Sequence, residues 1–188
     1  MHHVEVAGSE CARMATLPAV TVPVVVSQLW VFGDILGEPR DLDRVCVALV
    51  VDLPPAQVAW LARPAAAEHW LRMTRLVKNP LLVRWRPASL PVWNHRIVGP
   101  LLVWDLDLGV RDAALVALRE GRGAEAGDPV PSPDALAVRL DEERDLALEN
   151  VRACTAAYGD RQWGPTKLGP TADALWSACE GYLDVLGR

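Results

Sequence analysis

The chain has 188 residues, 51% of them hydrophobic, and a formal net charge of −5. This length predicts a single domain with one hydrophobic core, and the composition excludes intrinsic disorder, which requires low hydrophobicity and high net charge. The acidic balance argues against a nucleic-acid-binding protein, whose binding domain would carry an excess of basic residues.

The cysteines and the longest apolar run indicate where the protein works. The four cysteines lie far apart without a C-x-x-C pair, which predicts neither a zinc site nor a dithiol redox motif. The run 20–31 contains polar residues and is shorter than the roughly 18 apolar residues of a membrane span. The N-terminus also lacks the basic start and apolar stretch of a signal peptide. We therefore expect a cytoplasmic protein with buried free thiols and no contact with a membrane.

The N-terminal half predicts a helix, two strands and a second helix. Residues 1–15 can form a short helix, and residues 22–32 are rich in the β-branched and aromatic side chains typical of strands. Residues 44–51 form a nearly continuous apolar run, which indicates a strand covered on both faces. Residues 56–76 predict a helix that breaks near Pro64.

The next part of the chain again predicts two strands followed by a helix. Apolar runs at 81–85 and 101–104 predict two more strands, and the apolar spacing in 109–120 predicts a helix. Gly and Pro are frequent in 121–131, which therefore predicts a linker or a mobile loop.

Two helices are expected at the C-terminal end. Ser132 supplies an N-cap for a long helix whose apolar stripe is interrupted at Glu143, and residues 171–186 predict the final helix. The expected fold is α/β (α+β), with a mixed sheet of about four strands, flanking helices and a helical C-terminal part. We expect residues 1–124 to form the α/β core and 125–188 to pack on it as a helical segment of the same compact unit.

One segment carries residues suited to phosphate chemistry. Gly33 follows the first predicted strand, and Asp41 and Asp43 stand two residues apart at the start of the next. Carboxylates with this spacing on a strand point to the same side and can share a divalent cation. Such a cation can bridge nucleotide phosphates, while a glycine turn lets backbone N–H groups approach them.

The stretch Leu-Trp-Val-Phe-Gly-Asp-Ile-Leu-Gly-Glu at 29–38, followed by Asp-Leu-Asp at 41–43, resembles the signature of the DNA polymerase beta-like nucleotidyltransferase superfamily. In that family an apolar strand ends in Gly-Ser or Gly-Gly, and an Asp-x-Asp or Asp-x-Glu metal pair opens the next strand. The resemblance implies a nucleotidyltransferase-like core, Gly33 and Asp34 at a phosphate turn, and Asp41 and Asp43 as magnesium ligands. The whole chain also resembles an uncharacterised actinobacterial family of similar length.

Departures from that pattern predict a degenerate site. Asp34 stands where the family has a small residue, and its charge would repel a triphosphate. The interval from Asp34 to Asp41 is shorter than is usual in the family. The family's third carboxylate belongs on a later strand, and the first candidate strand carries Arg84 instead. Asp105 and Asp107, one strand further on, are the remaining candidate metal ligands. The alternative is an ordinary turn in which Asp side chains bond nearby backbone.

Residues 69–104 contain six basic residues and no acidic one. Arg84, Arg86 and Arg96 are the candidates for binding a phosphate or carboxylate in bidentate fashion. We favour the alternative that the arginines pair within the fold with Asp34, Asp41, Asp43 and Asp52, because the overall charge is acidic.

The loop Trp-Asn-His-Arg at 93–96 presents His95 as the candidate general base, beside Asp41 and Asp43 as candidate catalytic residues. A hydrogen-bonded structural histidine is the alternative reading of His95.

These patterns predict a degenerate nucleotidyltransferase-like protein that binds an anionic ligand, such as a nucleotide or phosphate, or a protein partner. One alternative is an active magnesium-dependent nucleotidyl or phosphoryl transferase that uses Asp41, Asp43 and either Asp105 or Asp107. Another is a non-catalytic interaction or scaffold protein. Magnesium is expected as a cofactor only if the protein is active.

Overall fold

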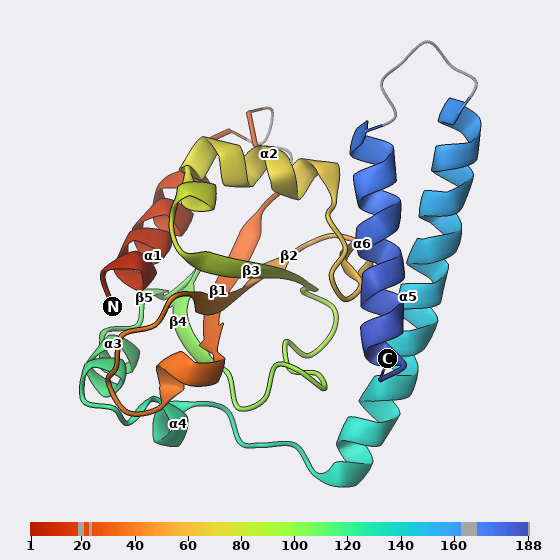
Figure 1. Ribbon diagram of the computed structural model, residues 1–188. Helices are drawn as coiled ribbons and strands as arrows, with labels where there is room; N and C mark the ends of the chain where they lie inside the picture. The colour runs from red at the N-terminus through yellow and green to blue at the C-terminus, as the bar shows by residue number, and fades with distance from the viewer. Residues whose placement is uncertain (19–20, 23, 163–168, 188) are drawn as a thin grey trace.

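A computed structural model describes residues 1–18, 21–22, 24–162 and 169–187 and shows a mixed α/β fold (Figure 1). Its five strands form one sheet in the order β3-β2-β1-β4-β5, in which β2 and β3 are parallel and the other neighbours antiparallel. The strands are β1 (Val26–Phe32), β2 (Val45–Val51), β3 (Leu81–Pro87), β4 (Leu101–Asp105) and β5 (Gly109–Val110). The predicted mixed sheet with flanking helices and a helical C-terminal part is therefore confirmed.

Most helices lie where the sequence predicted them. They are α1 (His2–Ala15), α2 (Ala65–Thr74), α3 (Asp112–Arg119), α4 (Gly123–Ala126), α5 (Pro133–Gln162) and α6 (Gly169–Val185), with the 3-10 turns η1 (Gly33–Leu36), η2 (Pro55–Val58) and η3 (Leu76–Lys78). Ser132 caps α5 as predicted, since its hydroxyl oxygen accepts a hydrogen bond of 3.2 Å from the Ala135 N–H.

Three local predictions need correction. The expected helix at 109–120 begins only at Asp112, because Gly109 first turns the chain back to pair with β4. The predicted linker at 121–131 contains the short helix α4. In the region 56–76, Pro64 marks the start of α2 as expected, but the piece before it is the 3-10 turn η2.

The two faces of the sheet carry different layers. Side chains alternate along each strand, so Leu29 and Leu49 point to one face while Phe32 and Val50 point to the other. The first face packs against α1, α2 and α3 and forms the main core. The second face packs against loop residues and the hairpin of α5 and α6, which stands beside the sheet in Figure 1.

A buried ion pair attaches α5 to the second face. Arg86 of β3 donates a hydrogen bond of 3.3 Å from Nη1 to Glu143 Oε2, and Nη2 of Arg139 lies 2.9 Å from Glu143 Oε1 as an ion pair without hydrogen-bond geometry. Burial alone would raise the pKa of Glu143, but the charge and hydrogen bond of Arg86 hold it below its ordinary value. Glu143, which interrupts the apolar stripe of α5, is therefore the residue that attaches this helix to β3.

Candidate ligand-binding cavity

The predicted phosphate turn lies on the surface. Gly33 adopts a left-handed conformation with φ of 75° at the end of β1, and the exposed Asp34 pairs with Arg40 at 2.7 Å. Asp41 and Asp43 are also exposed, and both precede β2 instead of lying on it. The strand alternation that would aim their carboxylates to one side therefore does not apply to them.

The third carboxylate lies at the wrong end of the sheet. Asp105 is opposite Gln28 in the pairing of β4 with β1, whereas the turn at Gly33 follows Phe32, four residues further along β1. Four residues of strand span about 13 Å. Asp105 accepts hydrogen bonds from Gln28 at 3.1 Å and from the Asp107 N–H at 3.0 Å.

The predicted metal site is consequently not assembled from these carboxylates. Within the described ranges, no three His, Cys, Asp or Glu side chains are arranged to hold a metal ion. Asp105 instead stabilises the turn between β4 and β5, because its carboxylate accepts the backbone N–H groups of Asp107 and Leu108. The pair Asp41 and Asp43 remains a prediction without a third ligand.

The three candidate anion-binding arginines have three different environments. Arg86 is 1% exposed and hydrogen-bonded to Glu143. The prediction that Arg86 binds a ligand is therefore wrong, because its guanidinium is covered. Arg96 donates from Nε to Asp184 of α6 at 3.1 Å. Arg84 forms no ion pair with any residue that the structure describes.

The prediction that these arginines pair within the fold is therefore correct for Arg86 and Arg96, but the predicted partners are wrong. The carboxylates that pair with Arg86 and Arg96 belong to α5 and α6, not to the N-terminal aspartates.

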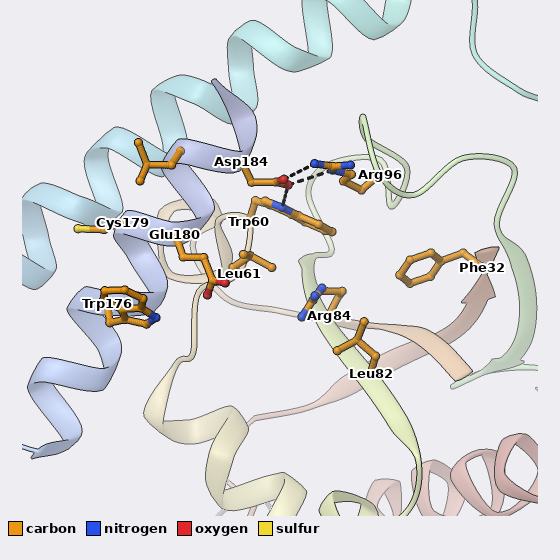
Figure 2. A pocket seen from close by; sticks show the side chains of 11 residues that line it. Phe32, Trp60, Leu61, Leu82, Arg84, Arg96, Trp176, Cys179, Glu180 and Asp184 are labelled. Atoms are coloured by element: carbon orange, nitrogen blue, oxygen red, sulfur yellow. Dashed lines mark hydrogen bonds and ion pairs between the residues drawn. The ribbon is translucent and has the colours of Figure 1, made fainter. Parts of the chain in front are cut away.

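Arg84 and Arg96 line a cavity between α6 and the second face of the sheet, with a volume of about 570 Å³ (Figure 2). Strand pairing builds its floor. Cys46 of β2 is opposite both Phe32 of β1 and Leu82 of β3, and Arg84 follows two residues later on the same face. The complete lining is Phe32, Trp60, Leu61, Leu82, Arg84, Arg96, Trp176, Cys179, Glu180, Leu183 and Asp184.

Arg84 is the unpaired cation of this cavity. Its guanidinium carbon lies 5.3 Å from the centre of the Trp60 ring, which gives a cation–π contact. Burial lowers the pKa of Arg84 below its ordinary value, because the charged form loses water. The ring of Trp60 compensates this loss only in part, since a cation–π contact is weaker than a buried hydrogen-bonded ion pair.

Asp184 holds α6 against the loops. Its carboxylate accepts hydrogen bonds from Trp60 Nε1 at 2.7 Å and from Arg96, and it lies 3.3 Å from His95 Nε2. Burial would raise the pKa of Asp184, but the hydrogen bonds from Arg96 and Trp60 lower it. His95 belongs to this cluster, packs edge-on against Trp60 and is absent from the cavity lining.

The wall formed by α6 is mixed in chemistry. Trp176 is 72% exposed, and Leu183, two turns further along, is 45% exposed. Glu180 lies on the same wall and forms no ion pair with the residues described. In Figure 2 the carboxylate of Glu180 points toward the guanidinium of Arg84 across the cavity. The cavity thus joins flat apolar surfaces to one free cation and one free carboxylate.

Sequence reasoning found two arginines of this cavity and missed its other half. The candidate site residues predicted from the sequence did not include Trp60, Trp176, Glu180 or Asp184. The available signal was the helical spacing of Trp176, Glu180 and Leu183 on the last helix, which places these side chains on one face.

Fold and cavity define a mixed α/β protein with a pocket between a five-stranded sheet and a C-terminal helical hairpin. The chain belongs to the family described as a domain of unknown function, DUF7711, whose model matches residues 1–188. No curated protein and no solved structure matches the chain. None of the described helices has both the length and the apolar character needed to cross a membrane.

Proposed function

We propose that the protein binds a small anionic molecule in this cavity, with the acid group of the ligand on Arg84. The half-buried guanidinium of Arg84, which forms no ion pair with the residues described, carries this proposal. A half-buried charge without a hydrogen-bonded ion-pair partner costs free energy, and a ligand carboxylate or phosphate would offset that cost through bidentate hydrogen bonds.

The rest of the lining supports a flat apolar body for the ligand. Phe32, Trp60 and Trp176 offer aromatic surfaces, and a volume of about 570 Å³ accommodates a molecule with one or two rings. Glu180 disfavours ligands as highly charged as a nucleoside triphosphate, because its carboxylate would repel them. Nucleoside monophosphates and aromatic carboxylates combine these properties.

A binding role without catalysis fits the side chains of the cavity. Asp184 is occupied by its contacts with Trp60, Arg96 and His95, and His95 is absent from the lining, so this carboxylate and this imidazole serve the fold. Four unpaired cysteines support the reducing cytoplasm as the place of this function.

A magnesium-dependent transferase at the surface turn is the second candidate. It is favoured by the left-handed Gly33 directly after β1, with Asp41 and Asp43 just before the adjacent strand. This candidate has two carboxylates and the additional negative charge of Asp34 at the turn.

Thermal unfolding with adenosine monophosphate, benzoate, or ATP with magnesium distinguishes the two candidates. We expect the monophosphate or benzoate to raise the unfolding midpoint of the wild type and of Arg152→Met, an exposed control on α5, but not that of Arg84→Met. Stabilisation by ATP with magnesium that survives Arg84→Met and is lost in the double variant Asp41→Asn, Asp43→Asn would instead favour the transferase. No stabilisation by any of these compounds would contradict both.

A further inference from the structure

The outer edge of β3 has backbone groups that no other strand in the described part of the chain uses. β3 is the last strand on its side of the sheet. The N–H of Val45 donates to the carbonyl of Pro80. The N–H of Ala88 donates to the carbonyl of Val51. In a parallel strand, the backbone groups of alternate residues bond the neighbouring strand. Since Pro80 and Ala88 bond β2, the backbone N–H and C=O groups of the even-numbered residues point to β2. Those of the odd-numbered residues point outward, namely Leu81, Val83 and Trp85.

A groove follows this edge. Its volume is about 480 Å³, and five consecutive β3 residues, 81–85, line it together with 61–63 and one side of α2. Successive residues of a strand point to opposite faces, so a groove lined by five in a row runs along the edge and not over one face. The N–H of Leu81 is bonded to Asn79, which leaves the N–H groups of Val83 and Trp85 for a partner.

The groove is positively charged in a protein whose overall charge is −5. Arg63, Arg72 and Arg84 line it, and Glu68 is its single acidic residue, 3.9 Å from Arg72. This wall belongs largely to the part of the sequence, 69–104, that contains no acidic residue. The charge favours an acidic occupant and disfavours a second copy, because pairing two β3 edges would bring two basic grooves together.

We propose that an extended acidic segment of a partner protein adds to β3 as a sixth strand. The outward N–H and C=O groups of Val83 would supply the main-chain hydrogen bonds, and Arg63 and Arg72 would pair with acidic side chains. This site goes beyond the small-molecule cavity, since Val83 lines the groove but not the cavity.

The test uses the full chain and a random twelve-residue peptide library displayed on phage. We expect enrichment of peptides that alternate acidic and β-branched residues, whose affinities are then measured by fluorescence anisotropy. Val83→Pro removes the outward N–H while keeping the bonds to β2, so it should weaken binding about tenfold, whereas Val83→Ala keeps the N–H and should retain most of it. Binding of adenosine monophosphate in the cavity should be equal in both variants.

A second measurement keeps the proposal falsifiable if Val83→Pro does not fold. Enriched peptides methylated on alternate backbone nitrogens should lose about tenfold in affinity for the wild type in one of the two alternations, because one set of N–H groups faces β3. Absence of enrichment, enrichment of basic peptides, or equal binding of both methylated forms would overturn the proposal. A dimer in light scattering that Val83→Pro disrupts and Val83→Ala leaves intact, while no peptide binds, would assign the edge to a second copy and overturn the proposal as well.

Discussion

The backbone carbonyl of Trp60 lies against Gly181 of α6, in the space where any side chain at position 181 would begin. The missing side chain lets α6 come close enough for Asp184, one turn later, to accept the hydrogen bond of the Trp60 indole. This approach sets the distance between α6 and the loop, and with it the width of the cavity.

The variant Gly181→Ala tests this contact. The new methyl group would overlap backbone atoms of Trp60, so we expect the free energy of unfolding to fall by about 1–3 kcal/mol and ligand affinity to weaken. Gly159 is the matched control on α5, because nothing lies within 4 Å of a Cβ added there, and Gly159→Ala should raise stability by about 0.5–1 kcal/mol. Urea unfolding measures both values, and equal effects would contradict the role of Gly181.

The buried Glu143 should contribute far more to stability than its exposed neighbour. Glu143→Gln leaves Arg86 and Arg139 buried without their carboxylate, which should cost about 3–5 kcal/mol. Glu142 also pairs with Arg139, but its side chain is 52% exposed, so Glu142→Gln should cost less than about 1 kcal/mol. Similar unfolding free energies for the two variants in urea would show that α5 does not depend on the pair.

Glu143 and Asp184 also predict the response to acid. The pKa of each carboxyl is lower in the folded protein than its ordinary value, so each contributes stability above the ordinary carboxyl pKa range. This contribution is lost as the pH falls through the lowered folded values, below about pH 4. Urea midpoints measured between pH 7 and pH 3 should fall steeply for the wild type and less for Glu143→Gln. Parallel curves for the two proteins would contradict this assignment.

Removing the charge of Arg84 should stabilise the empty protein. Arg84→Met replaces a half-buried cation by an apolar side chain of similar length, and the gain should exceed the lost contact with the Trp60 ring. We expect an unfolding midpoint about 2–4 °C higher, the change that about 1 kcal/mol produces in a chain of this size. A lower midpoint in differential scanning calorimetry would mean that Arg84 serves the fold and not a ligand.

The sequence predicted the elements whose signals are local. The apolar run of β2 and the cap at Ser132 depend on adjacent residues, and both elements are present in the structure. The strand β5 was missed because two residues after a glycine turn give no periodic pattern.

The candidate site could be predicted only in part, because it depends on contacts distant in sequence. Arg86 lies on the same face of β3 as Arg84, but only the position of α5 shows that one is covered and the other open to the cavity. The end of the sheet at which Asp105 lies likewise follows from the antiparallel pairing of β4 with β1. Neither arrangement leaves a pattern in the neighbouring residues.

The ion pair between Arg86 and Glu143 also limits how α5 can vary during evolution. An apolar helix can slide along an apolar sheet at modest cost. A shift of α5 by one turn, about 5.4 Å, would separate Arg86 from Glu143 and leave both charges buried without a partner. Homologous chains are therefore free to exchange the exposed residues of α5, whereas a change at position 143 requires a compensating change at position 86.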